Sequence, residues 1–254
     1  MYHFFVEPFQ VHTDYVEILG GDVKHIRNVL RMKAGEKITI SDGFGHEYLC
    51  RITELADEWV RAEIQEQREV AAELPSRLIL FQCLPKGDKM ELIIQKAVEL
   101  GAAEIVPVSS RRCVAKLDAR KEENKRKRWQ AIAESAAKQS GRAVVPKVKP
   151  AVDFGQALKQ AGELDVRLIP YECADELLED GQSSAMQKTR ETLDSIRRGQ
   201  SVGIFIGPEG GLEKEEVAAA IKAGAKPVTL GKRILRTETA GLCILSVLMF
   251  RLEE

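Results

Sequence analysis

From residue 77 onward, apolar runs alternate with amphipathic stretches, and this alternation constrains the fold more than any other feature. Residues 77–84 read RLILFQCL, and such a nearly continuous apolar run is typical of a parallel strand buried on both faces. In the stretch that follows, apolar residues recur on one helical face (Met90, Ile94, Ala97, Val98). The pattern predicts an α/β fold with a mostly parallel sheet.

The same reasoning predicts the remaining elements of this region. We expect further strands at 104–108, 165–170, 201–206 and 226–229, and helices at 122–140, 213–223 and 237–252. The helix after the first strand is predicted to begin at Asp88, with Glu91 completing a capping box. Residues 174–188 are expected to form a loop or an irregular segment.

The first 72 residues have a different character. Short β-like runs at 37–40, 47–52 and 59–64 are separated by turn signals, notably Asp42-Gly43-Phe44-Gly45. They predict a small β-barrel with one inserted helix, followed by a linker at 71–76. We therefore divide the chain into a β-barrel domain, 1–72, and an α/β domain, 73–254.

Composition excludes several classes of protein. The 254 residues carry a net charge of −1, with 44% hydrophobic and 30% charged residues, which argues against a uniformly basic, a disordered or a membrane protein. The densest apolar run, 241–250, is about half the length that spans a bilayer. The five cysteines form no C-x-x-C pair. Because Glu7 and Pro8 interrupt the N-terminal apolar residues, we expect no signal peptide. We therefore expect a cytoplasmic location.

Two glycine-containing turns are candidates for a ligand site. Residues 202–213 run from an apolar strand through Gly207-Pro208-Glu209-Gly210-Gly211 into a helix, and glycines permit close approach of a ligand to the backbone. Residues 228–240 repeat this arrangement with three cations and a Glu. The alternatives are an ordinary tight turn and a solvated loop with Thr237 as N-cap. Neither segment is a G-x-G-x-x-G fingerprint or a P-loop.

Charge and histidine content add further constraints. Residues 111–149 contain 13 basic and 4 acidic residues, a local surplus of +9, which suits a nucleic-acid backbone but also an ordinary solvated helix face. In residues 22–33, Lys24, Arg27, Asn28 and Arg31 form a polar helical stripe. All four histidines lie before residue 47. The larger domain therefore excludes His-based triads and mixed His/Cys metal sites, and leaves positioning, backbone dipoles, Arg and carboxylates.

Several segments together resemble the ribosomal RNA small-subunit methyltransferase E family of the SPOUT superfamily. They are 25–31 (HIRNVLR), 86–91 (KGDKME), 95–101 (QKAVELG), 139–142 (QSGR), 206–211 (IGPEGG) and 230–240 (LGKRILRTETA). The resemblance implies a PUA-like β-barrel and an α/β domain with a C-terminal trefoil knot. It also implies a homodimer that transfers a methyl group from S-adenosylmethionine to N3 of a uridine in 16S ribosomal RNA, without a metal or a membrane.

The resemblance assigns roles to residues of this chain. Cofactor contacts are expected from three turns: Leu168, Ile169, Pro170, Tyr171 and Glu172; Ile206, Gly207, Pro208, Glu209, Gly210 and Gly211; Leu230, Gly231, Ile234, Leu235, Arg236, Thr239 and Ala240. RNA contacts are expected from Lys24, His25, Arg27, Arg31, Arg112, Arg126 and Arg142. Arg142 and Arg236 are candidates for holding phosphate or stabilising the uracil anion. Glu209 and Glu238 are candidate bases, although a structural ion pair explains each equally well.

Two other functions stay open at this stage. The chain could be an RNA-binding ribosome-assembly factor without catalysis, in which case S-adenosylmethionine would not bind. The glycine-containing turns could instead serve another nucleotide in a metabolic enzyme, which competition with NAD and ATP would reveal.

Overall fold

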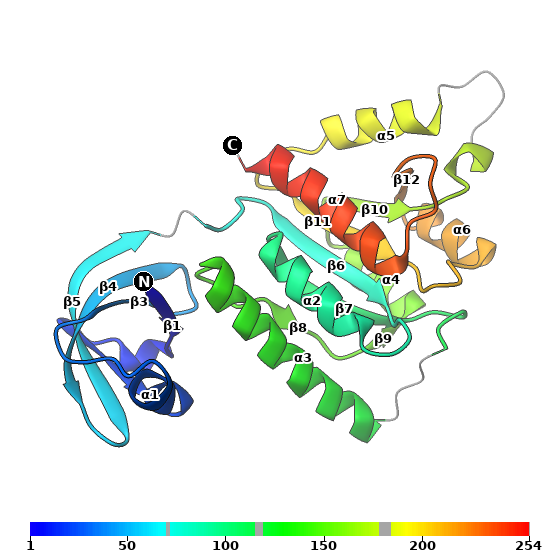
Figure 1. Cartoon of the computed structure of the whole chain (residues 1–254). Coiled ribbons are helices and arrows are strands. Elements are labelled where there is room, and N and C mark those ends of the chain that lie inside the picture. Colours follow the sequence, from blue (N-terminus) through cyan, green and yellow to red (C-terminus); the bar gives the residue numbers. More distant parts are fainter. Residues whose placement is uncertain (70–71, 115–118, 178–183, 254) are drawn as a thin grey trace. The chain divides into compact units, whose positions relative to one another are not determined.

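The computed structural model describes residues 1–69, 72–114, 119–177 and 184–253, and it divides into two compact units (Figure 1). Unit 1 comprises Met1–Glu73 with Ala137–Val145, and unit 2 comprises Leu74–Ala136 with Pro146–Glu254. Sequence patterns gave no sign of the second segment of unit 1. The division into 1–72 and 73–254 stays a prediction.

Unit 1 is built on a five-stranded sheet in the order β1-β3-β4-β5-β2. Its strands are β1 (Tyr2–Phe5), β2 (Tyr15–Leu19), β3 (Lys37–Ser41), β4 (His46–Leu55) and β5 (Trp59–Glu69). β1 pairs with β3 in parallel, and the other neighbours are antiparallel. The three predicted strands are confirmed. β1 and β2 were missed because four or five residues show too little alternation to be distinguished from a loop.

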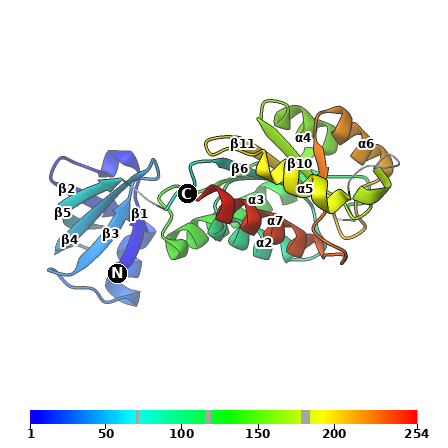
Figure 2. The same ribbon diagram turned by 90° about the horizontal axis from the view of Figure 1, so that it is seen from above.

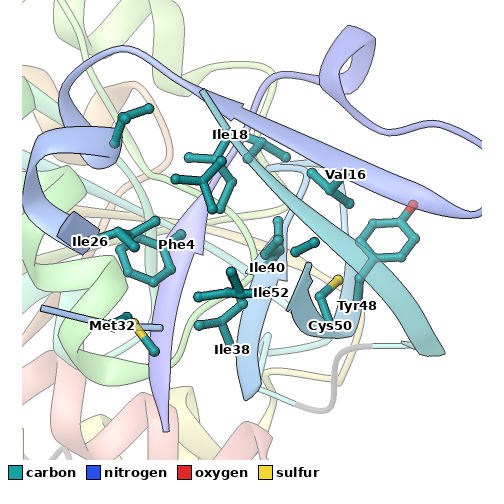
Figure 3. Packing of buried hydrophobic residues seen from close by; sticks show 14 residues of the cluster. Phe4, Val16, Ile18, Ile26, Met32, Ile38, Ile40, Tyr48, Cys50 and Ile52 are labelled. Carbon is teal, nitrogen blue, oxygen red and sulfur yellow. The ribbon is translucent and has the colours of Figure 1, made fainter. Parts of the chain in front are cut away.

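Apolar side chains from alternate strand positions fill the core of unit 1 (Figure 3). The inserted helix contributes Val23 and Ile26, both almost fully buried. The polar stripe suggested a helix over 22–33, but the helix that forms is shorter. α1 (Gly21–Lys24) passes into one π-helical turn, η2 (His25–Val29). Arg31 then adopts a φ of 52°, which ends the helix.

Unit 2 contains a parallel sheet in the order β12-β10-β11-β6-β7-β8, with β9 also pairing with β7. The predicted α/β fold with a parallel sheet is thereby confirmed. Its strands are β6 (Arg77–Cys83), β7 (Ala102–Ser109), β8 (Lys147–Val148), β9 (Val152–Asp153), β10 (Val166–Pro170), β11 (Ser201–Ile206) and β12 (Lys226–Val228). All pairs are parallel, so the carboxyl ends of β6, β10, β11 and β12 meet at one edge.

Helices cover both faces of this sheet (Figure 2). α2 (Lys89–Glu99) packs against α7 (Thr237–Leu252) on one face, and α4 (Phe154–Ala161) and α6 (Lys214–Lys222) lie on the other. α3 (Ala119–Ser140) and α5 (Ala185–Asp194) complete the set that the structure describes. The sequence pattern of α3 predicts a core face of Trp129, Ile132, Ala133, Ala136 and Ala137; all are buried except Ile132, which is half-buried.

Two local predictions were wrong. Residues 174–188 are not simply irregular, because a 3-10 turn covers Ala174–Leu177 and α5 begins at Ala185; residues 178–183 lie outside the described part. α5 buries only Ala185 and Thr189, so its apolar periodicity is weak. The side chain of Asp88 caps no backbone group, and Glu91 forms an ion pair with Arg128 (2.9 Å) instead of a capping box.

We predict that Phe205→Ala destabilises unit 2 strongly. Phe205 is 1% exposed; it stacks on Phe81 with ring centroids 4.6 Å apart and meets Phe154 edge-on at 5.9 Å. Emptying such a site costs about 3–5 kcal/mol in free energy of unfolding. Chemical denaturation measures this cost. The exposed Phe44 is the control, because Phe44→Ala should change stability by less than about 0.5 kcal/mol.

Candidate functional site

A cavity of about 520 Å³ lies in unit 2, where β10 and β11 end. Ligands of parallel sheets bind at such carboxyl edges. Three chain segments and the first turn of α2 form its wall, which consists of Lys89, Pro170, Tyr171, Glu172, Ile206, Gly207, Pro208, Glu209, Gly210, Gly211, Leu212, Ile234, Leu235, Arg236, Thr237 and Ala240. The wall combines apolar side chains with carboxylates and cations, as sites for small polar molecules do.

The glycine-containing turn after β11 is tightly folded. A Cβ added to Gly207 would lie 3.2 Å from Leu212 Cγ and 3.3 Å from the carbonyl carbon of Gly211. Gly211 has a φ of 71°, and its N–H donates to the carbonyl of Pro208 (2.9 Å). Gly210 has more room, since its nearest neighbour would be Arg112 Cδ at 3.6 Å. Gly207 and Gly211 are thus required by the turn itself.

Arg112 fixes this turn from outside. Its guanidinium donates to the Gly210 carbonyl (2.8 Å) and to both carboxylate oxygens of Glu213 (2.8 and 3.1 Å). The hydrogen bond from Arg112 lowers the pKa of Glu213. Beside this contact, the buried Glu216 accepts the backbone N–H of Arg111 (2.9 Å). Arg112 was predicted to contact RNA, but in the structure its guanidinium is bonded to Glu213 and to the Gly210 carbonyl.

A buried hydrogen-bonded chain joins the two turns beneath the cavity. The amide of Gln82 at the end of β6 donates to the Thr237 hydroxyl (2.9 Å), which donates to the Gly207 carbonyl (2.6 Å). The alternative in which Thr237 is the N-cap is wrong: α7 begins at Thr237, and Arg236 occupies the N-cap position without a side-chain cap. The Thr237 hydroxyl instead connects β6, β11 and α7.

Lys89 connects the two acidic residues that were candidate bases. Its ammonium lies 3.1 Å from Glu209 Oε1 and 3.3 Å from Glu238 Oε2. Burial raises the pKa of the Glu209 carboxyl, but hydrogen bonds from its own N–H, from the N–H of Lys86 and from Lys89 together leave that pKa below its ordinary value. Glu209 is therefore ionised at neutral pH.

Three further cations lie on the segment that leads into α7, and one of them, Arg236, lines the cavity. Lys232, Arg233 and Arg236 are exposed, and none forms an ion pair with another residue that the structure describes. Ile234 stands among them with 82% of its surface exposed. Within the described ranges, no group of three His, Cys, Asp or Glu residues could hold a metal ion.

Comparison with known proteins agrees with this geometry. A family model described as "RNA methyltransferase domain" matches residues 72–249, and one described as "RNA methyltransferase PUA domain" matches residues 18–65. The chain is 39% identical to ribosomal RNA small subunit methyltransferase E of Bacillus subtilis over 236 residues, covering 93% of this chain and 90% of the relative.

The chain belongs to the ribosomal RNA small subunit methyltransferase E family. Solved structures agree. The family member of Neisseria gonorrhoeae, crystallised bound to S-adenosyl methionine, is 33% identical with a TM-score of 0.83, covering 99% of this chain and 98% of its own. A putative methyltransferase of Legionella pneumophila in complex with the same molecule is 31% identical with a TM-score of 0.81, covering 98% and 97%. The resemblance seen in the sequence is thereby confirmed.

Most of the residues assigned to the cofactor by family resemblance line the cavity. Five do not: Leu168 and Ile169 are fully buried within β10, and Leu230, Gly231 and Thr239 lie outside the wall. Sequence reasoning missed Lys89, Leu212 and Thr237, which the structure adds to the wall. Lys89 lies within the KGDKME segment that carried part of the family resemblance, so its place in the sequence offered a signal.

Arg142 is not an exposed cation. It is 4% exposed and belongs to unit 1, where it donates to both oxygens of Glu73 (3.2 and 2.5 Å). Glu73 also accepts the backbone N–H groups of Ala143 and Val144, each at 3.1 Å. These contacts give Arg142 a structural role in joining Ala137–Val145 to the rest of unit 1.

The other residues predicted to contact RNA differ in exposure and in whether they form ion pairs. Lys24, His25 and Arg31 are exposed, whereas Arg27 lies 2.6 Å from the exposed Asp57. On α3, Arg126 forms an ion pair with Glu123 (3.0 Å). Carboxylates from outside 111–149, Glu91 beside Arg128 and Glu213 beside Arg112, offset part of the +9 surplus of that stretch.

We predict that Arg142→Met lowers the stability of unit 1. Removing one partner of a buried ion pair leaves a carboxylate without its counter-charge and costs about 3 kcal/mol. Arg126→Met is the matched control, since its pair with Glu123 is exposed and should contribute less than about 1 kcal/mol. Thermal unfolding of both variants tests this. An Arg142→Met protein as stable as the original, but slow in catalysis, would contradict the structural role.

Proposed function

We propose that this protein transfers the methyl group of S-adenosylmethionine to N3 of a uridine in 16S ribosomal RNA. The supporting observation is the cavity at the carboxyl edge of the parallel sheet, built from the three turns in which the family resemblance placed the cofactor. Membership of the methyltransferase family supports the reaction class. Action on ribosomal RNA suits a cytoplasmic protein. Within the described part of the chain, no helix is long and apolar enough to cross a membrane.

The cavity fits the cofactor in size and chemistry. Its volume of about 520 Å³ lies within the usual range for small-molecule sites. Pro170, Ile206 and Leu235 offer apolar contact for the adenine, and the turn from Gly207 to Gly211 brings backbone groups to the wall without side chains. When bound, S-adenosylmethionine supplies an electrophilic methyl group on a positively charged sulfur.

The chain's own residues must expose and deprotonate the base. Uridine N3 carries a proton and is paired in a duplex, so the target must be unpaired or extruded. The carboxylates of Glu209 and Glu238 are the candidate acceptors of that proton, and Glu209 lines the cavity. Arg236 on the cavity wall and Lys232 and Arg233, which precede it in the same segment, are exposed and suit the RNA phosphates.

We also propose a homodimer with a trefoil knot in each subunit, as the family resemblance implies. Two observations support the dimer: α7 carries apolar residues around most of its circumference, and Phe250 and Val247 on it are 84% and 37% exposed. A helix that is apolar all round is normally buried. After β11 the chain returns to the far side of β10, where β12 pairs with it, so that β10 lies between β11 and β12. This order is compatible with a knotted C-terminal part.

Mass spectrometry of ribosomal RNA tests the proposed function. Small ribosomal subunits from cells lacking the enzyme, incubated with the protein and S-adenosylmethionine, should gain one N3-methyluridine in the 16S RNA. Binding of the RNA without methylation would favour the assembly-factor alternative. Methylation at another base atom would contradict the proposed chemistry.

We predict that Gly207→Ala weakens S-adenosylmethionine binding by on the order of tenfold or more. The new Cβ would lie 3.3 Å from the backbone of Gly211 and force the turn to shift, at about 1–3 kcal/mol. Gly21→Ala is the control, because Gly21 lies outside the wall and an added Cβ would meet nothing within 4 Å. Isothermal titration calorimetry measures both affinities. An unchanged affinity of the Gly207→Ala protein would contradict the assignment of the cavity.

We predict that Phe250→Lys converts the dimer into a monomer. A charged side chain at the centre of an apolar contact would be desolvated without a partner, which is strongly unfavourable. Sedimentation velocity gives the mass of the original protein and of the variant. Phe44→Lys, at another exposed phenylalanine, should leave the mass unchanged. A monomeric original protein would contradict the proposed dimer.

A further inference from the structure

Lys89 is the one charged group of α2 on the wall of the cavity. Its ammonium joins carboxylates from two other elements, Glu209 in the turn after β11 and Glu238 in the first turn of α7 (3.1 and 3.3 Å). Its side chain is still 30% exposed. No role was assigned to it from the sequence.

An ammonium carries three N–H donors, and the ion pairs with Glu209 and Glu238 engage at most two of them. The third donor belongs to a group that lines the cavity, so it can reach a bound molecule. The hydrogen bond that Lys89 donates to Glu209 raises the pKa of Lys89. Lys89 is therefore charged at neutral pH and acts as a donor, not as a base.

Methylation of uridine at N3 creates a need for such a donor. N3 lies between two carbonyl groups, and loss of its proton spreads negative charge over N3 and both carbonyl oxygens. A donor that is already oriented toward the place where charge develops lowers the barrier most. Two carboxylates hold Lys89 in place, whereas Arg236, the other cation of the wall, forms no ion pair with a described residue.

On the basis of the proposed function, we propose that Lys89 is a catalytic residue that donates a hydrogen bond to a uracil carbonyl oxygen beside N3 and stabilises the uracil anion. The N3 proton passes to a carboxylate oxygen of Glu209 or Glu238. The N3 electron pair forms the new N–CH₃ bond, and the S–CH₃ bond breaks with its electrons remaining on sulfur. Lys89 stays protonated throughout.

The test compares Lys89→Met with the original protein on two RNAs. One is small-subunit RNA containing uridine, and the other contains 5-fluorouridine, whose N3 proton is more acidic because fluorine withdraws electrons. Single-turnover rates at saturating S-adenosylmethionine should fall about 100-fold on uridine and clearly less on 5-fluorouridine. Lys89→Arg keeps the charge and should retain more activity than Lys89→Met.

Lys96→Met is the matched control. Lys96 lies on the same helix and is also paired with a carboxylate, Glu99 at 2.8 Å, but it does not line the cavity. This variant should react at the original rate on both RNAs. An equal loss on both RNAs for Lys89→Met, or no loss, would overturn the proposal. An original protein that forms no N3-methyluridine would instead contradict the proposed function itself.

A second readout does not depend on methyl transfer. Fluorine-19 NMR of an RNA fragment with 5-fluorouridine at the target position follows ionisation of N3 as the pH is raised. Bound to the original protein or to Lys96→Met, the base should ionise at lower pH than in free RNA. Bound to Lys89→Met, it should ionise closer to the pH of free RNA. Identical titrations with all three proteins would overturn the role of Lys89.

Discussion

The site depends on the parallel pairing of β10, β11 and β6. This pairing brings the ends of strands that lie far apart in sequence to one edge of the sheet, with Leu168 beside Ile204 and Gln82 beside Ile206. Buried contacts then fix the turns that follow. The chain from Gln82 through Thr237 to the Gly207 carbonyl joins three elements at this edge. These contacts fix the positions of the two turns relative to each other.

Charge in the site is organised by pairing. Arg112 stabilises the glycine-containing turn through Glu213 and the Gly210 carbonyl, and Lys89 holds Glu209 and Glu238. Such groups are oriented before a ligand arrives, which favours electrostatic catalysis. Lys232, Arg233 and Arg236 form no ion pair with a residue in the described ranges; they lie on one segment and suit an anionic polymer. Paired charges thus hold the site in shape, whereas the exposed cations of this segment are available to an anionic ligand.

Much of the architecture could be predicted from the sequence, because buried parallel strands form long apolar runs. The strand at 201–206 and the helix at 237–252 have the bounds expected. α4 and α5 could not be found, since they are short or mostly polar, and the two first strands show little alternation. The part of unit 1 formed by Ala137–Val145 depends on tertiary contacts such as Arg142 with Glu73, which no local pattern contains.

The turns of the site could also be predicted from a local pattern in the sequence, whereas the partners of individual charges could not. Glycine spacing marked 207–211, but nothing local showed that Arg112 would pair with Glu213 or that Lys89 would join two carboxylates from distant segments. Family resemblance placed Leu168 and Ile169 at the cofactor, yet their side chains are fully buried within β10. Spacing thus locates a turn, and only the fold decides which side chains face the cavity.

Hydrogen–deuterium exchange with saturating S-adenosylmethionine tests the central claim most directly. The account predicts slower exchange in the turns at 206–212 and 230–240, with little change in unit 1. Protection confined to another cavity, which Arg77, Glu104 and Lys149 line near the start of β6, would contradict it.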